Sequence, residues 1–178
     1  VKDSTGKEIK TGRSNANGEV LIQGLAPGTY TLEEKRAPND YIKNPTVSKP
    51  FTIADNHTED QPAIVELTDP ALVNYRQKVQ MQKLDAKTNT GLAGAEFAVR
   101  KKGTGTPQYY VRENPDGTIT WGPRNQAQRF LSNATGLVEG PALGSGTYEF
   151  EEIKAVKDYV RNSALVEFTI QDETDAAL

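Results

Sequence analysis

The sequence predicts an all-β protein made of two tandem antiparallel β-sandwiches. The tract GTYTLEEKRAPNDY at 28–41 returns as GTYEFEEIKAVKDY at 146–159, so the chain holds two copies of one module. Short stretches rich in β-branched and aromatic residues are separated by Gly, Pro, Asn and Asp at close intervals, a pattern typical of antiparallel strands. No window of 11 residues keeps a helical period, and 126–132 allows at most a short helical turn. Many short strands with regular turn signals favour sandwiches.

The repeat is long enough to be a duplicated domain. At an offset of about 118 residues, SNANG at 14–18 returns as SNATG at 132–136, and FTI at 51–53 returns at 168–170 with one residue deleted. This unit exceeds that of a solenoid or a propeller blade. We therefore expect two domains, 1–76 and 77–178. No Gly/Ser-rich or Pro-rich spacer lies near the seam at 75–79, which favours a stiff connection.

Composition excludes several classes of function. The 178 residues, 35% of them hydrophobic, suit two small cores. The net charge is −3 and no long basic run occurs, so we expect no nucleic-acid partner. No apolar stretch approaches the roughly 20 residues that span a bilayer, so we expect no membrane insertion of this segment. No secretory leader opens the chain and no anchoring tail closes it, so we expect a piece of a larger protein.

The residue types needed for common catalytic and metal sites are scarce. There is no cysteine, which rules out disulfides and zinc sites built on thiolates. The single histidine, His57, lies in the polar stretch DNHTED and fits a solvated loop. Asp55, Glu59 and Asp60 do not have the spacing of an EF-hand loop. We expect no cofactor and no metal, and an enzyme of the transthyretin-like fold has no support.

The clearest hairpin is YYVRENPDGTITW, in which Asn-Pro-Asp-Gly at 114–117 forms the turn. It predicts strands at 109–113 and 118–121. The hairpin carries three aromatic residues, Tyr109, Tyr110 and Trp121. They form either an exposed platform for a ligand or, at alternate positions, part of the core.

Strand alternation places charged residues on core-facing sides. Side chains in a strand point to opposite faces with a period of two. Glu34 therefore shares a face with Tyr30 and Leu32, and Glu152 with Tyr148 and Phe150, while Glu33 and Glu151 face solvent. By the same count Lys83 joins Val79 and Met81, and Asn74 joins Leu72. A buried charge is costly, so such groups end at a strand edge, pair, accept backbone hydrogen bonds, or react.

These residues and motifs resemble a known family. The order KLD, TNTGLAGAEFAV, SNATGLVEG and GTYEFEEIKA, with SNANGEVLIQGLAPGTYTLEEKRAPNDY in the first copy, is similar to the Cna B-type domain of Gram-positive pilins and cell-wall adhesins. The resemblance implies an Ig-like, prealbumin-like sandwich. It also implies an extracellular, cell-wall-anchored location and sortase-linked pilin subunits as partners, with host extracellular matrix as a further partner.

The resemblance also implies a covalent cross-link. Many such domains join a Lys on the first strand to an Asn on the last through an isopeptide bond that a Glu or Asp promotes. Carried over by position, Lys83 and Glu152 are the lysine and the acid of the second module. Glu34 and Asn74 are the acid and the acceptor of the first. Burial favours a neutral amine and a protonated acid, and close positioning supplies the effective concentration. The reaction happens once per domain and is not turnover.

Two departures leave both modules truncated. The first copy lacks the strand that should carry its Lys, since Lys2, Lys7 and Lys10 lie in loop-like sequence. The second lacks the strand that should carry its Asn, and Asn162 lies in a turn.

We therefore expect a structural stalk segment of a pilus or surface adhesin. No LPxTG-like sorting motif and no YPK-like motif occurs in the sequence, so its place in a pilus stays open. The alternative from another class is an adhesin module that binds a matrix protein or a glycan.

Overall fold

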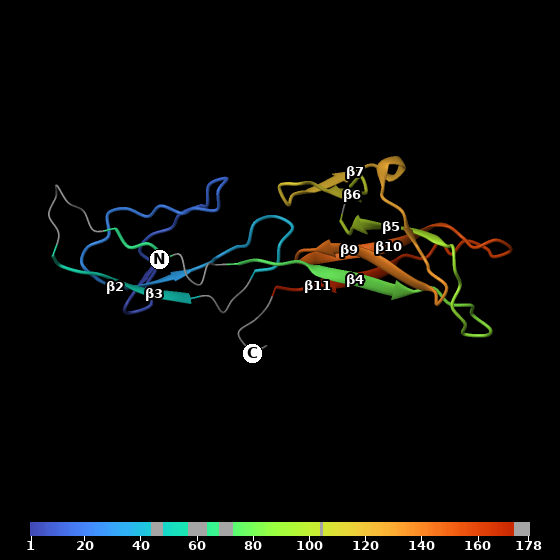
Figure 1. The fold of residues 1–178 in the computed structure, drawn as a ribbon, viewed down its shortest axis with the longest axis horizontal. Coiled ribbons are helices and arrows are strands. Elements are labelled where there is room, and N and C mark those ends of the chain that lie inside the picture. The colour runs from blue at the N-terminus through green and yellow to red at the C-terminus, as the bar shows by residue number, and fades with distance from the viewer. Residues whose placement is uncertain (44–47, 57–63, 68–72, 104, 173–178) are drawn as a thin grey trace. The chain divides into compact units, whose positions relative to one another are not determined.

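The computed structural model describes residues 1–43, 48–56, 64–67, 73–103 and 105–172 (Figure 1). His57, Glu59, Asp60 and Leu72 lie outside the described residues. All sheets are antiparallel, and the single helix in the described ranges is the 3₁₀ turn η1, Arg124–Gln126. This confirms the all-β prediction. Within the part of the chain that the structure describes, no helix is long and apolar enough to cross a bilayer.

The chain divides into two compact units that differ from the copied tracts in one segment. Unit 2 comprises Asn74–Asp172 together with Pro38–Lys43, six residues taken from the connection between the second and third strands. Unit 1 contains Val1–Ala37 and the described part of Asn44–Val73. The domain limits 1–76 and 77–178 stay a prediction from the repeat.

Unit 1 contains one three-stranded sheet, in the order β1 (Lys2–Asp3), β2 (Gly28–Glu33) and β3 (Ser48–Ile53). Tyr30 is buried and packs on Phe51 of β3, with ring centroids 5.6 Å apart. Lys2 lies in β1 and not in a loop as its sequence suggested, because it pairs with Thr31 of β2. Its Nζ lies 2.6 Å from the exposed carboxylate of Glu33.

Unit 2 contains two sheets (Figure 1). The larger follows the order β11-β10-β5-β6-β7, with β8 paired to β5, and the smaller pairs β4 with β9. The strands are β4 (Gln77–Gln82), β5 (Glu96–Lys101), β6 (Tyr109–Glu113), β7 (Ile119–Gly122), β8 (Phe130–Leu131), β9 (Leu137–Leu143), β10 (Gly146–Lys154) and β11 (Val166–Ile170).

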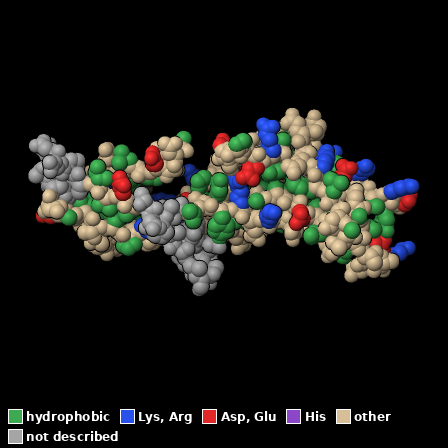
Figure 2. Space-filling model, in the orientation of Figure 1, with side chains coloured by type: hydrophobic (Ala, Val, Ile, Leu, Met, Phe, Trp, Pro, Cys, Tyr) green, Lys and Arg blue, Asp and Glu red, His purple; other side chains and the backbone are tan. Residues whose placement is uncertain are grey.

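The main core of unit 2 lies between these sheets. Val79 and Val138 of the smaller sheet join Phe97, Tyr148 and Phe150 of the larger in one buried cluster. Gly140 of β9 shows how closely the sheets approach, because a Cβ there would lie 3.0 Å from the ring of Phe150. Outside this core, side chains of both charges are interspersed over the visible face of unit 2 (Figure 2).

The two copies have the same local geometry. Tyr30 donates a hydrogen bond to Ala26 O at 2.7 Å, and its equivalent Tyr148 donates to Gly144 O at 3.1 Å. The turns of SNANG and SNATG both place glycine in the left-handed region, with φ near 80°. The duplication therefore extends from sequence to hydrogen bonding.

The predicted hairpin forms as β6 and β7, with the second strand beginning at Ile119. Its turn is fixed by Asp116, whose Oδ1 accepts hydrogen bonds from Thr118 N at 2.9 Å and Oγ1 at 2.7 Å. The short helical turn that 126–132 allowed lies mostly before this range, at Arg124–Gln126. It ends at Gln126, because Phe130 pairs with Phe97 of β5 and extends the sheet instead.

Candidate functional site

Glu152 is the most buried charged side chain among the described residues, at 2% exposure. It lies on β10, where Phe97 of β5 is its register partner. Tyr148 and Phe150 precede it on the same face and are buried in the main core. The alternation of GTYEFEE therefore carries a carboxyl group into an apolar environment.

Lys83 reaches this carboxyl group from the other sheet. It follows β4, and its backbone is held on both sides, since its N–H donates to Gly136 O at 2.7 Å and its carbonyl accepts from Leu92 N at 3.0 Å. A Cβ at Gly136 would overlap the Lys83 carbonyl oxygen, so the glycine of the copied SNATG turn permits this approach. Lys83 Nζ lies 3.1 Å from Glu152 Oε1, and the lysine side chain is 18% exposed.

The two oxygens of Glu152 have different partners. Oε2 accepts a hydrogen bond from the backbone N–H of Asn162 at 2.6 Å. Oε1 lies at ion-pair distance from Lys83 but has no aligned hydrogen bond, although it is fully buried. The two observations are compatible: the amine nitrogen lies within ion-pair distance of Oε1, but none of its N–H bonds points at a lone pair of that oxygen. Oε1 is therefore the oxygen that can take a third group.

Asn162 contributes to the site in a way that the sequence did not indicate. Its backbone N–H holds Glu152, while its side-chain Oδ1 accepts a hydrogen bond from Ala164 N at 2.9 Å. Arg161 NH1 donates to the Glu152 carbonyl oxygen at 3.0 Å. Arg161 and Asn162 therefore position Glu152. The residue types did not predict this role, because the contact to the Glu152 carboxyl group is made by a backbone N–H.

A groove runs from the Lys83–Glu152 pair along two strands. Among the described residues β4 pairs only with β9, and β11 only with β10, so each has an unpaired edge. One cavity of about 290 Å³ borders the pair, and another of about 250 Å³ continues beside β4 and β11; Phe150 and Val166 line both. Unpaired edges with apolar lining accept an added strand.

The other two predicted residues belong to different units. Glu34 follows β2 in unit 1 and is half-buried. Asn74 lies in unit 2, is half-buried, and donates through Nδ2 to Ile42 O at 3.2 Å. The structure thus brings together Lys83 and Glu152, but not Glu34 and Asn74 within one unit.

Glu151 corrects one expectation. It points to the opposite face of β10, as predicted, but its side chain is only 13% exposed. Tyr109 donates to its Oε2 at 2.5 Å and Arg124 to its Oε1 at 2.9 Å. Burial opposes ionisation, yet these two hydrogen bonds hold the pKa of Glu151 below its ordinary value. A small cluster of Ala98, Tyr109 and Ala127 covers this second face, which the sequence did not predict.

The aromatic residues of the hairpin do not form an exposed platform. Tyr109 and Tyr110 are buried, on opposite faces of the sheet. Trp121 is half-buried and stacks on Tyr148 with centroids 5.9 Å apart. These side chains pack in the cores of unit 2, so the hairpin aromatics no longer support a ligand-binding module.

The family comparison agrees with this architecture. A model of the SpaA prealbumin-like fold domain matches residues 1–67 and 77–178. The chain therefore belongs to this family, and the predicted Cna B-type resemblance is confirmed. No curated protein sequence matches the chain.

Pilins are among the solved structures with similar folds. The backbone protein of the group B streptococcus pilus 2b matches with TM-score 0.50 and 19% identity, over 89% of this chain and 69% of that one. The SpaE basal pilin from Lactobacillus rhamnosus GG matches with TM-score 0.51 and 21% identity, over 86% and 52%. A streptococcal ancillary pilin is 26% identical over 92% and 45%, with TM-score 0.45. The chain spans about half the length of the basal and ancillary pilins. The chain thus shares the fold of the backbone and basal pilins.

Proposed function

We propose that this chain is a structural segment of a Gram-positive pilus or surface-adhesin stalk, displayed outside the cell wall and joined to other pilin subunits by sortase. Membership of the prealbumin-like family and the fold shared with backbone and basal pilins support this role. The proposed work is mechanical. Tandem sandwiches hold a tip away from the wall and resist extension.

We further propose that Lys83 and Glu152 cross-link unit 2 to an asparagine on an added strand. A proton passes from the Lys83 ammonium to the Glu152 carboxylate, and the amine so formed attacks the asparagine side-chain carbonyl. A C–N bond forms, and the carboxamide nitrogen leaves as ammonia. Glu152 takes a proton from the amine and delivers it to the leaving nitrogen, and in its protonated form it polarises the carbonyl. The observation that carries this proposal is the 3.1 Å approach of Nζ to a buried carboxyl oxygen that lacks an aligned partner.

The groove beside β4 and β11 supports the same chemistry. A strand laid between these edges passes Lys83, so its asparagine is held against the amine in a cavity that Met81, Phe97 and Phe150 help to line. The first module is proposed to use Glu34 as acid and Asn74 as acceptor, on the resemblance alone. Each bond forms once, so the module is a self-modifying structural element.

Intact-mass measurement of the longer parent protein tests the cross-link. Each bond lowers the mass by one ammonia, and fragment spectra should show Lys83 joined to an asparagine. Glu152→Gln should restore the unmodified mass in its module. The matched control is Glu151→Gln, one residue away on the opposite face, which should leave the bond intact. An uncross-linked wild-type protein, or full cross-linking in Glu152→Gln, would contradict the proposal.

A further inference from the structure

The copied tract forms the same turn twice. Tyr41 N donates to Pro38 O at 3.2 Å in the first copy, and Tyr159 N donates to Val156 O at 3.1 Å in the second. Asp40 and Asp158 have φ values of 65° and 69°, in the left-handed region that few non-glycine residues adopt. We call Pro38–Lys43 the first loop and Val156–Arg161 the second loop.

The first loop is seated in unit 2. Ile42 is 2% exposed and belongs to the main core cluster of that unit. The carboxylate of Asp40 accepts a hydrogen bond from Trp121 Nε1 at 3.3 Å and pairs with Lys101 Nζ at 3.2 Å. Lys43 N donates to Asp172 Oδ1 at 2.8 Å. The loop inserts an apolar side chain and anchors its ends with polar contacts.

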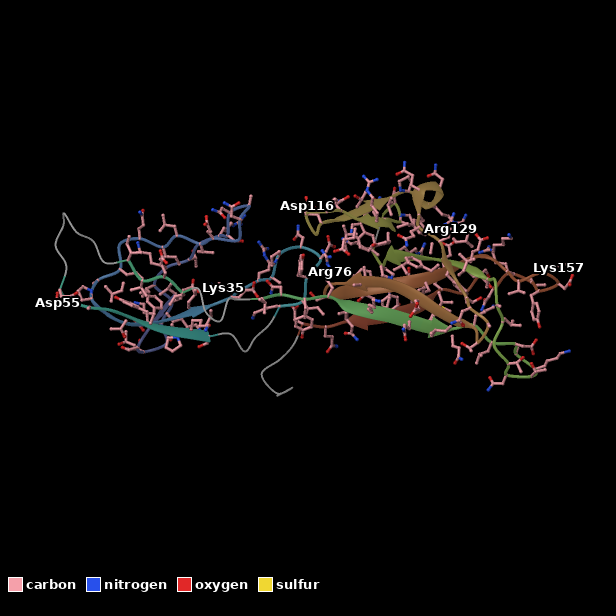
Figure 3. The ribbon with its side chains drawn as sticks, in the orientation of Figure 1. Lys35, Asp55, Arg76, Asp116, Arg129 and Lys157 are labelled. Atoms are coloured by element: carbon pink, nitrogen blue, oxygen red, sulfur yellow. The ribbon has the colours of Figure 1, made fainter. Side chains whose placement is uncertain are left out.

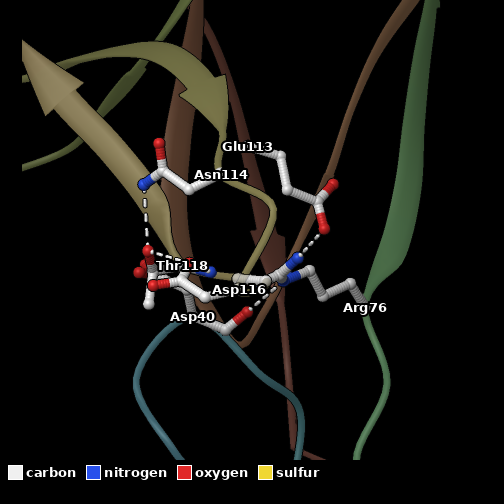
Figure 4. A network of polar contacts seen from close by, with 7 residues as sticks. Asp40, Arg76, Glu113, Asn114, Asp116 and Thr118 are labelled. Carbon is white, nitrogen blue, oxygen red and sulfur yellow. Dashed lines mark hydrogen bonds and ion pairs between the residues drawn. The ribbon is translucent and has the colours of Figure 1, made fainter.

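Arg76 closes the socket around this loop (Figure 4). Its Nε donates to Asp40 O at 2.9 Å, its guanidinium carbon lies 4.2 Å from the centroid of the Tyr41 ring, and NH1 pairs with Glu113 at 2.6 Å. Gly144 allows the backbones to touch, since a Cβ there would overlap Tyr41 N and lie 2.6 Å from Asp40 O. The socket thus holds both the backbone and the side chains of this turn.

The second loop has the same turn but no socket. Val160, the equivalent of Ile42, is 92% exposed, and Tyr159 is 43% exposed. Tyr159 donates to Asp85 Oδ2 at 2.7 Å, which holds the base of the loop on its own unit. A single exposed valine is ordinary on a protein surface. Val160 is unusual because its equivalent in the first loop, Ile42, is a core residue.

Socket and second loop lie at opposite ends of unit 2. The strand β10 begins at Gly146, beside Gly144 of the socket, and ends at Lys154, just before the second loop. Figure 3 shows Arg76 and Lys157 at opposite ends of this unit. Modules that carry such a loop at one end and such a socket at the other join head to tail.

We propose that the second loop docks into another prealbumin-like module whose socket is built like that of unit 2, with arginine in the place of Arg76 and glycine in the place of Gly144. Val160 enters its core, and Asp158 meets its lysine and tryptophan. A second copy of this chain is not the partner. Its unit 2 socket is filled by its own first loop, and Ala26 stands at the position equivalent to Gly144 in its first copy. This interface does not require the proposed cross-link, because neither Lys83 nor Glu152 belongs to the loop or the socket.

Exchange of the loops tests whether the second loop fits such a socket. In the full chain, 38–43 is replaced by the sequence VKDYVR, and in a control by GSGSGS. Trp121, the only tryptophan, reports unfolding of unit 2 by its fluorescence. We expect the control to lower the melting temperature by about 5–10 °C and the exchange variant by at most half as much. An exchange variant as unstable as the control overturns the proposal.

Docking is tested with the open socket of the GSGSGS variant, or of a variant in which only 40–42 is replaced by GSG if the first variant loses its β-sheet circular dichroism. Either acceptor is titrated into ¹⁵N-labelled wild-type chain. We expect amide shifts at Tyr159 and Val160 that disappear in labelled Val160→Asp. Absence of shifts, or equal shifts in Val160→Asp, overturns the proposal. Self-association of the wild-type chain that Val160→Asp abolishes overturns it as well, because the partner is then a second copy.

Discussion

Glu151 and Glu152 are neighbours on β10 and meet opposite environments. Glu152 faces the main core, with one oxygen held by Asn162 N and the other beside Lys83. Glu151 faces a smaller cluster, and each of its oxygens accepts a hydrogen bond, one from Tyr109 and one from Arg124. Both are largely buried, so burial alone does not mark the candidate acid. What distinguishes Glu152 is an oxygen with unused bonding capacity next to an amine.

The Lys83–Glu152 pair should be strongly coupled in stability. Lys83→Met leaves the Glu152 carboxylate buried without its counter-charge, and we expect a loss of about 3–5 kcal/mol in the free energy of unfolding. The double variant Lys83→Met/Glu152→Gln should lose less, because no charge is then left unpaired. Denaturant unfolding followed by Trp121 fluorescence measures the cycle. Additive losses would show that the two groups do not interact.

The backbone of the first loop lies so close to Gly144 that adding one methyl group at position 144 should displace the loop. A Cβ at 144 would overlap the backbone of Tyr41, so Gly144→Ala should displace the loop and lower the free energy of unfolding by about 2 kcal/mol or more. Gly103→Ala is the matched control, because a Cβ there meets nothing within 4 Å. Denaturant midpoints of the two variants give the comparison, and equal midpoints would contradict a tight contact at Gly144.

Sequence reasoning predicted the strands better than it predicted what surrounds them. Period-two alternation placed Tyr148, Phe150 and Glu152 on one face because each strand obeys it locally. The same rule assigned Glu151 to solvent, since alternation says which face a residue takes and not what covers that face. The residues that cover it, Ala127 and Tyr109, come from other elements.

The candidate site shows the same limit. Lys83 and Glu152 were predicted from alternation and resemblance, but the hold of Asn162 on Glu152 comes from a backbone N–H that any residue but proline supplies. The burial of Ile42 in unit 2 was also not predicted. Its equivalent Val160 occupies the same turn and is exposed, so the turn sequence alone does not indicate burial. The same local turn, formed twice, does not specify a tertiary partner.

Tyr159 should control the ionisation of Asp85. The backbone N–H of Thr88 and then the hydroxyl of Tyr159 are the main causes that lower the pKa of Asp85 from 3.8 to about 2. The folded pKa lies below the unfolded value, so this stabilisation is present above pH 3.8 and is lost as the pH falls through about 2. Tyr159→Phe should raise the pKa of Asp85, measured by NMR titration of its carboxyl carbon. Tyr109→Phe, whose hydroxyl bonds Glu151, should not, and an unchanged pKa in Tyr159→Phe would refute the assignment.

Ile42 and Val160 provide the sharpest matched pair in the chain, since they hold equivalent positions in one turn at 2% and 92% exposure. Ile42→Ala removes buried methyl groups and leaves a cavity in the core of unit 2, so we expect a loss of about 2–4 kcal/mol. Val160→Ala removes methyl groups that are already in water, and we expect a change within about 0.5 kcal/mol. Urea unfolding of both variants, followed by Trp121 fluorescence, measures the difference. A comparable loss in Val160→Ala would mean that the second loop already packs on its own unit and is not available to a partner.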